Sequence, residues 1–586
     1  MGGRSGEVVA QRRSAAVPGM ILRSLRPYVL LPFLGLLAFL LAYPIFMVLY
    51  ASFKGGPPGE VAPFTLDGYV RAWGSWSTYK ALILTFALGI PRVVLGVGIA
   101  LVITWIITRT NTPLRWLFEQ LMWFHVFLPT LPMVLSWILI AGGRSGLLNK
   151  FLMNTFNLAN PPLNIQSYWG VIFYSVIGGG TMFFLYASPA FRNMDASLEE
   201  SSRVSGASAL TTLFRITTPL LMPAILGVTF LMFLFTLSSY ETELFFLYHK
   251  GAYVLSTWIW WQAQKMPPDY PTAMALASIF VVFVVAIIVL QFKILGNRQY
   301  VTITGRGFGI RTTDLGRWKW VTFGFLTLLN LVGLIAPLTV LIIGTFLNSH
   351  AVLSSGFTLD HWKRALGDPA VIKSIRNTLE LGVMVAISST VLFGLMSYMY
   401  LKTKLRFRQW IEILSWVPRS APAVVLSLGV VWAVLGGGIP GARAIYGTLA
   451  LMAIVILLDR TPQGMRLMNA GLVQLSAELE EASRVSGGSW FLTIRKVVMP
   501  VIMPTLLNQG LLSFVMATRA LVVLLFMYMP ASVVLSIDIF THMMTNEPQV
   551  AAILGVILTA LTTGVAILAR IVAFRQRKVM EVVPVG

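Results

Sequence analysis

The chain has 586 residues, of which 56% are hydrophobic and only 11% are charged. A soluble domain carries about 25% charged residues, so a free globular protein is excluded, and the excess of apolar sequence predicts a surface that faces lipid. The formal net charge is +22, but many of the bases stand in short connections between apolar runs, which indicates membrane topology rather than a nucleic-acid partner. Cysteine is absent, which excludes disulfides and thiolate metal sites.

Apolar runs long enough to cross a bilayer follow one another along the whole chain. A spanning helix needs about 20 residues. The runs predict membrane helices near residues 28–52, 80–108, 116–140, 168–190, 219–247, 271–295, 320–347, 377–401, 409–435, 446–459, 499–528 and 549–572. The fold class is therefore predicted as an all-α polytopic membrane protein with about 12 helices.

Basic residues predict the orientation of these helices. A basic tail, residues 1–27, precedes a first apolar run that is too long for a signal peptide, so we expect a retained membrane helix. The segments 297–319 and 574–586 are also rich in Lys and Arg. The positive-inside rule then places both termini and the central linker in the cytoplasm.

The sequence contains an internal repeat. Residues 64–67, Phe-Thr-Leu-Asp, recur at 357–360, an offset of 293. Residues 198–223 match residues 479–504 at an offset of 281, with 13 of 26 positions identical. Because each copy contains six predicted spans and starts inside, the chain divides into two parallel halves, residues 28–296 and 320–573, joined by the linker 297–319.

The two matching segments, 198–223 and 479–504, connect the fourth and fifth predicted spans of their halves. Each has a charged helix-forming part, a glycine that permits a backbone turn, and a second short helix with bulky side chains. Pro219 and Pro500 are expected to end that helix and to begin the next membrane span. A helix–turn–helix without a core of its own is typical of a docking element for a soluble partner; an ordinary charged loop is the alternative.

Both segments resemble the EAA loop of ATP-binding-cassette (ABC) importer permeases, whose core is Glu-Ala-Ala, three residues, Gly, and an apolar stretch ending in Pro. Ser replaces Ala in both copies, and Gly488 stands where Ala is usual. The resemblance implies a fused two-half permease, with two separate ATPase subunits docked on its loops and an extracytoplasmic binding protein as a further partner. The residues that it implies in ATPase coupling are Glu200, Arg203, Gly206, Ala207, Phe214, Pro219, Glu481, Arg484, Gly487, Gly488, Trp490 and Pro500.

The resemblance also suggests a substrate and a location. Residues 357–366 and 416–432 look most like the ferric-iron branch; thiamine, polyamine, phosphonate and sugar importers stay open. The implied site is the bacterial inner membrane, with no cofactor on this chain and ATP-Mg on the partner subunits. No Walker A pattern, metal-ligand spacing or catalytic constellation is legible, so the chain is expected not to be an enzyme. A secondary transporter is the alternative class, and a membrane enzyme is the third.

Ionisable groups inside membrane spans are expensive to bury and are candidate functional residues. Arg92 is one, and the predicted pathway set is His125, Tyr240, Glu241, Glu243, Arg419 and Arg519. Glu241 and Arg519 lie at matching levels and are expected to face each other or the substrate. The structural alternative is that these charges pair internally or extend to the interface. Four prolines, Pro129, Pro132, Pro418 and Pro422, predict kinks in the third span of each half.

Overall fold

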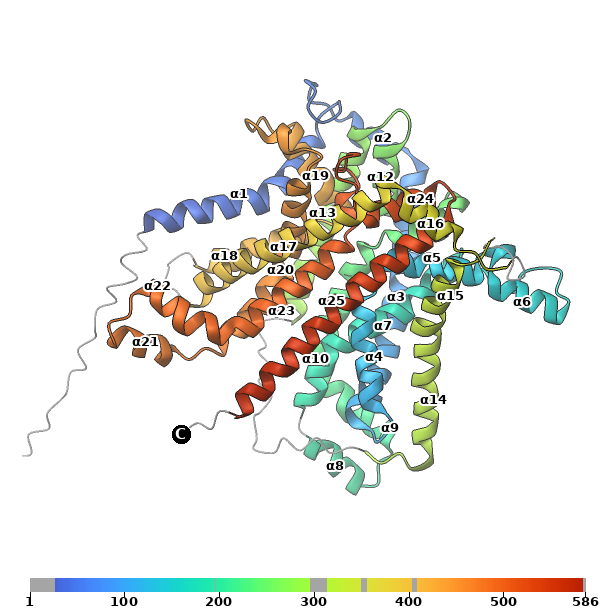
Figure 1. The fold of residues 1–586 in the computed structure, drawn as a ribbon, viewed down its shortest axis with the longest axis vertical. Helices are drawn as coiled ribbons and strands as arrows, with labels where there is room; N and C mark the ends of the chain where they lie inside the picture. The colour runs from blue at the N-terminus through green and yellow to red at the C-terminus, as the bar shows by residue number, and fades with distance from the viewer. Residues whose placement is uncertain (1–26, 195, 296–312, 349–355, 403–407, 583–586) are drawn as a thin grey trace, which may run out of the picture.

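The computed structural model describes residues 27–194, 196–295, 313–348, 356–402 and 408–582 (Figure 1). Within these ranges the chain forms helices and no named strand, and nine of the helices are long and apolar enough to cross a membrane. Two further spans are pairs of helices joined by a sharp bend. The predicted all-α polytopic membrane fold is confirmed. Residues 1–26, 296–312 and 583–586, which hold most of the predicted tails and linker, lie outside the described ranges.

The long helices follow the predicted apolar runs, most of them with shifted ends. They are α1 (Pro27–Ala51), α3 (Trp76–Arg109), α7 (Tyr168–Asn193), α10 (Thr218–Leu237), α13 (Tyr270–Leu295), α14 (Lys319–Asn330) continuing into α15 (Ala336–Gly344), α17 (Pro369–Lys402), α20 (Leu449–Val473), α23 (Met499–Thr518) and α25 (Pro548–Val582). Shorter helices connect them: α2 (Asp67–Gly74), α6 (Leu147–Phe156), α11 (Glu241–Leu247), α12 (Leu255–Gln264), α16 (Asp360–Gly367) and α24 (Leu535–Met544).

The third span of each half is broken rather than kinked. In the first half the break separates two helices that meet at 103°, and in the second half the angle is 104°. Pro129 and Pro422 stand immediately before the second helix of each pair, where a residue without an N–H group ends the preceding hydrogen-bond ladder. The spans predicted at 116–140 and 409–435 are therefore each made of two helices rather than one kinked helix. The helices are α4 (Arg115–Phe127), α5 (Thr130–Ala141), α18 (Arg408–Trp416) and α19 (Ala423–Leu435).

Three other predicted spans need correction. The fifth spans, predicted at 219–247 and 499–528, end earlier, at Leu237 and Thr518, and a non-helical break follows each. The span predicted at 446–459 is a helix that continues to Val473, because the charged residues after Leu458 end the apolar run without ending the helix. Hydropathy predicted only the apolar first part of this helix and did not predict the more polar part from Arg460 to Val473.

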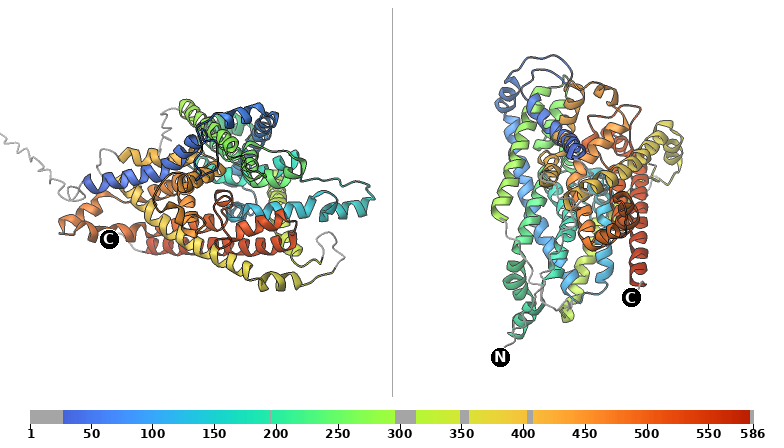
Figure 2. Two further views of the ribbon diagram at one scale, coloured as in Figure 1. Left: turned by 90° about the horizontal axis from the view of Figure 1, so that it is seen from above. Right: turned by 90° about the vertical axis from the view of Figure 1, so that its left-hand side faces the viewer.

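The first helix of each predicted half packs against the other half. Figures 1 and 2 show α1 beside the second-half helices, and α14 beside the first-half helices. The α1–α19 contact is so close that a Cβ on Gly429 would come within 2.4 Å of the Pro44 carbonyl oxygen. The Tyr43 hydroxyl also donates a hydrogen bond to the Gly437 carbonyl at 3.0 Å. The helices therefore pack in two bundles that exchange their first spans: α1 lies with the second half, and α14 lies with the first half.

The Phe-Thr-Leu-Asp repeat builds the same structure twice. An antiparallel bridge joins Lys54 to Phe64, and its counterpart joins Leu347 to Phe357. The threonine hydroxyl of each copy, at positions 65 and 358, accepts a hydrogen bond at 3.1 Å from the backbone N–H of the aspartate two residues on, at the start of α2 or α16. The repeat thus forms a turn that leads from an isolated β-bridge into a short helix before each second span.

A polar cluster ties α2 to the start of α13. The Asp269 carboxylate accepts hydrogen bonds from Arg71 at 3.1 Å and from the Thr272 hydroxyl at 2.8 Å. Burial opposes the ionisation of Asp269, but the hydrogen bonds from Thr272 and Arg71 outweigh it and hold its pKa below its ordinary value. The cluster lies between membrane spans and stabilises the connection before α13.

Candidate functional site

The two segments with EAA-type sequence adopt the same conformation. In each, a nine-residue helix leads to a glycine with positive φ, +83° at Gly206 and +81° at Gly487, and a second helix follows. Only glycine adopts this conformation without steric cost. The elements are α8 (Ala196–Val204), α9 (Ala209–Thr212), α21 (Ala477–Val485) and α22 (Trp490–Thr493). Figure 1 shows the two segments apart from each other: α8 lies at the bottom, below α10, and α21 lies at the left, beside α22 and α23.

Matching side-chain contacts fix the turn in both copies. The hydroxyls of Ser202 and Thr212 are 2.9 Å apart, and those of Ser483 and Thr493 are 2.8 Å apart. At the turn itself, Val204 and Val485 are each 89% exposed. Each helix pair therefore presents an apolar side chain to its surroundings from a locally rigid frame, as a docking surface requires.

Pro219 and Pro500 do not end a helix, contrary to the prediction. The second helix of each segment runs without a break into the fifth span through a π-helical turn, Leu213–Thr217 in one half and Ile494–Val498 in the other. Because a proline ring clashes with the carbonyl four residues before it, a wider turn at this point lets the helix continue past the proline. The second helix of each EAA-type segment and the fifth span are thus one continuous helix.

A buried base joins the first-half loop to two membrane helices. Arg109, the last residue of α3, lies 3.7 Å from the Glu199 carboxylate. Its guanidinium also donates to the carbonyls of Phe191 and, at 2.8 Å, Met194, at the end of α7. Glu199 accepts a further hydrogen bond from Thr217 at 2.7 Å. These contacts form one junction between α3, α7 and the loop.

The second half builds the same junction from different residues. Lys402, the last residue of α17, lies 3.8 Å from the Glu480 carboxylate and donates to the Leu475 carbonyl at 2.6 Å, just beyond α20. Glu199 and Glu480 are each only 6% exposed. Sequence reasoning assigned the coupling role to the second glutamate of each pair and missed the first. The signal that could have found it was the recurrence of a base at the end of each second span, at the repeat offset of 293.

The other predicted coupling residues fall on the same elements. Phe214 is 66% exposed and Glu481 is exposed, whereas Gly488 packs against the backbone and side chain of Ser483. Ala207 lies in the turn, where its N–H donates to the Ser202 carbonyl at 3.1 Å. The side chains of Glu200, Arg203, Arg484 and Trp490 lie outside the described part of the structure, and their coupling roles stay predictions.

The predicted pathway residues gather around a cavity of about 320 Å³ between the spans. Its wall is formed by α3, α7, α10, the α4–α5 break and two residues from the second half, Gly333 and Arg519. His125 and Arg519 line the cavity directly. Tyr240 is buried, with its ring edge-on to Trp260 at 5.9 Å. The structure therefore brings two of the six predicted residues into the cavity wall itself.

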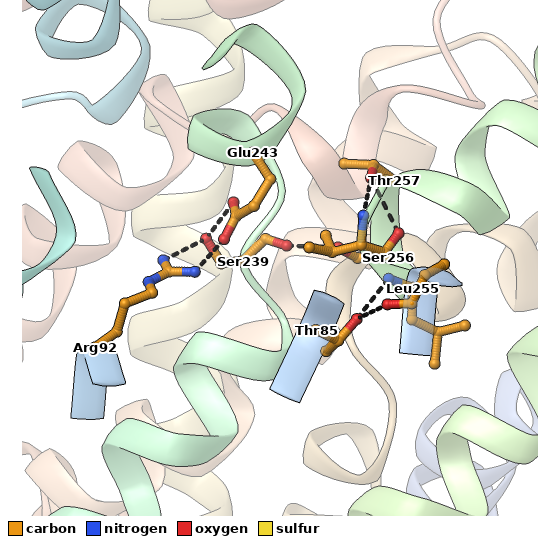
Figure 3. A network of polar contacts seen from close by, with 9 residues as sticks. Thr85, Arg92, Ser239, Glu243, Leu255, Ser256 and Thr257 are labelled. Atoms are coloured by element: carbon orange, nitrogen blue, oxygen red, sulfur yellow. Dashed lines mark hydrogen bonds and ion pairs between the residues drawn. The ribbon is translucent and has the colours of Figure 1, made fainter. Parts of the chain in front are cut away.

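Glu243 takes part in a buried ion pair. Arg92 donates to Glu243 and, at 3.1 Å, to the Ser239 hydroxyl, which in turn donates to Glu243 at 2.7 Å (Figure 3). The matching second-half positions, 92 + 293 and 243 + 281, are Val385 and Leu524, both buried and apolar. The structural alternative, internal pairing, therefore holds for Glu243.

Arg519 crosses from the second half to the broken span of the first. One of its terminal nitrogens donates to the carbonyls of Val126 at 2.7 Å and Leu128 at 3.1 Å, which belong to the α4–α5 break. Half-buried Glu241 begins α11 and lies within electrostatic reach of Arg519, beyond ion-pairing distance. Arg519 therefore makes its hydrogen bonds to backbone carbonyls, and the predicted facing of Glu241 and Arg519 stays a prediction.

Arg419 lies at the corresponding break of the second half. Its guanidinium stacks on the Phe235 ring at 4.2 Å, and Phe235 itself lines the cavity. Such a contact contributes about 0.5–2 kcal/mol. In the described residues no group of three or more His, Asp or Glu side chains is placed to hold a metal ion. Each broken span thus contacts an arginine or an aromatic ring of the other half.

Comparison with known proteins accounts for this architecture. The family described as binding-protein-dependent transport system inner membrane component matches residues 390–578. This range contains the second EAA-type loop and its buried junction. The second half of the chain therefore contains a domain of this family of ABC importer permeases. The permease is 26% identical to a protein of Actinobacillus pleuropneumoniae named as a ferric transport system permease, over 90% of this chain and 75% of that protein.

Two other relatives extend the comparison. A protein of Haemophilus influenzae, also named for ferric transport, is 25% identical over 84% of the permease and 76% of its own length. A protein of Salmonella typhi named for 2-aminoethylphosphonate transport is 24% identical over 40% of the permease and 88% of its own length. The permease is therefore the membrane-embedded component of an ABC importer, which sets aside the secondary transporter and the membrane enzyme.

Proposed function

We propose that the permease forms the translocation pathway for ferric iron in a bacterial inner membrane. The observation that carries the substrate is the similarity to ferric transport permeases along most of the chain. An imported phosphonate is the second candidate, because a relative named for 2-aminoethylphosphonate transport matches a shorter part of the chain. Both termini lie in the cytoplasm in this proposal, as the basic segments predict.

Energy enters through the two EAA-type loops. Two ATPase subunits dock on them, one on α8–α9 and one on α21–α22, and they bind ATP-Mg and carry out hydrolysis. An extracytoplasmic binding protein delivers substrate to the opposite face. Because each docking helix continues into a fifth span and each first glutamate contacts the end of a second span, movement of an ATPase subunit is transmitted to the helices around the cavity. The permease itself contributes differential contacts between its two states.

Reconstitution tests this proposal. Permease, ATPase subunits and binding protein of the same system are placed in proteoliposomes, and ATP hydrolysis is measured with the binding protein empty, loaded with ferric iron, or loaded with 2-aminoethylphosphonate. We expect iron to stimulate hydrolysis and uptake. The Glu200→Gln/Glu481→Gln double variant should lose ATPase docking, whereas Glu60→Gln, in an exposed loop on the other side, should retain it. If only the phosphonate-loaded binding protein stimulates ATP hydrolysis, the substrate is the phosphonate and not ferric iron.

A further inference from the structure

Guanidinium groups gather in and behind the wall of this cavity, which is unusual for a membrane interior. Arg519 lines the cavity, and Arg419 covers the Phe235 ring that also lines it. Arg460, on α20, lies within electrostatic reach of both. The acids within reach of these bases are Asp459, 3.0 Å from Arg460, and Glu241. Three cations and two acids leave one positive charge in excess, in a place where burying any charge is costly.

Several hydrogen-bond donors at this site have weak partners or none. The second terminal nitrogen of Arg519 contacts only the Met516 sulfur, at 3.1 Å, among the described residues, and a thioether is a weak acceptor. One terminal nitrogen of Arg419 is buried without a hydrogen-bond partner in the described part of the chain. The Ser175 hydroxyl, also in the cavity wall, is buried and similarly unpartnered there. Buried donors of this kind are satisfied when an acceptor enters.

These donors do not form a site for a bare metal cation. The described residues around the cavity provide no cluster of metal-ligating side chains. The nearby Glu243 is already neutralised by Arg92. A ferric ion without its own ligands would instead meet the uncompensated charge of the arginines, which raises its energy at short range. Guanidinium groups match the geometry of phosphate, phosphonate and carboxylate oxygens.

We propose that this cavity is an oxyanion-binding station on the translocation pathway, with Arg519 and Arg419 as its cations. The inference rests on the proposed function and specifies the form of the cargo. Iron crosses as a complex with phosphate, and a free phosphonate uses the same donors. The anionic oxygens of the cargo then accept hydrogen bonds from these guanidinium groups, and the Ser175 hydroxyl provides an additional donor.

Double-label uptake tests the proposal in proteoliposomes that contain the permease, its ATPase subunits and its binding protein. The binding protein is loaded with ⁵⁵Fe and ³²P-phosphate, and a parallel sample receives labelled 2-aminoethylphosphonate. We expect ATP-dependent entry of ³²P together with ⁵⁵Fe, or entry of the phosphonate, and each supports the station from one source of oxyanion. Entry of ⁵⁵Fe without any anion label would overturn it while leaving the importer intact.

Variants locate the effect at the cavity. Arg519→Gln and Arg419→Gln should each lower labelled uptake by about tenfold, the size expected for one lost charged contact, and Arg519→Lys should retain part of it. Arg376→Gln is the matched control, because Arg376 is exposed and pairs with Glu380 on its own helix. If the Arg519→Gln variant assembles poorly, the Arg419→Gln variant decides whether the station exists. Arg419 contacts an aromatic ring rather than backbone carbonyls, so its loss should disturb assembly less. Unchanged uptake by both Arg419→Gln and Arg519→Lys overturns the station. No ATP-dependent uptake of any label by the wild type overturns the proposed function instead.

Discussion

The Arg92–Glu243 pair allows a sharp test of how charge is tolerated inside this permease. Arg92 is 8% exposed and Glu243 is 1% exposed. Glu243→Gln leaves the guanidinium buried beside a neutral amide, and breaking a buried pair costs about 3–5 kcal/mol. Because Ser239 keeps one hydrogen bond to Arg92, we expect a loss near the lower end, about 3 kcal/mol.

The second half indicates how the pair can be replaced. Its matching residues are Val385 and Leu524. An apolar replacement of a buried ion pair is often neutral or stabilising by about 1–4 kcal/mol. The double variant Arg92→Val/Glu243→Leu should therefore recover most of the stability that Glu243→Gln loses, although it removes a charge from the cavity wall and should transport poorly.

The assay is equilibrium unfolding of the purified permease in mixed micelles, followed by tryptophan fluorescence as the denaturing detergent increases. Wild type, Glu243→Gln, the double variant and the surface control Glu60→Gln are compared. A shift of the midpoint for Glu243→Gln alone is the expected result. The reasoning is refuted if Glu243→Gln has the same unfolding midpoint as the wild type, or if the double variant has a lower midpoint than Glu243→Gln.

Two further predictions concern the EAA-type loops, and a third concerns Asp269 in the connection before α13. Gly206→Val places a branched residue at φ +83°, which costs about 1–2 kcal/mol, so co-purification of the ATPase should fall, whereas Gly74→Ala, which has open space around it, should not change it. Glu199→Gln should leave ATPase docking intact but lower the substrate transported per ATP hydrolysed; an unchanged ratio would contradict the junction's role. Because the pKa of Asp269 is lowered on folding, its contribution to stability is present above its unfolded pKa and is lost as pH falls through the folded value. Unfolding midpoints measured between about pH 5 and pH 3 should therefore fall more for wild type than for Asp269→Asn.

The amino-acid sequence by itself determined the class of fold and the position of the two EAA-type loops. Long apolar runs can be stable only in lipid, so their number and spacing fix an all-α membrane fold. Glycine at positions 206 and 487 predicts the turn because its conformational requirement is local. The repeat offsets identified both loops because the identity of 13 residues in 26 aligned positions can be recognised without knowing any contact.

Tertiary structure decided which groups meet. Hydropathy cannot tell that α1 packs on α19 of the other half, because an apolar helix face fits many partners. The sharp breaks at Pro129 and Pro422 depend on acceptors and donors from other helices, such as Arg519, which compensates the carbonyls freed in the first half. Similarly, Glu199 and Glu480 became buried junction residues only because the ends of the second and fourth spans converge on them. The sequence specified the charges, and the packing of helices far apart in the chain determined their partners.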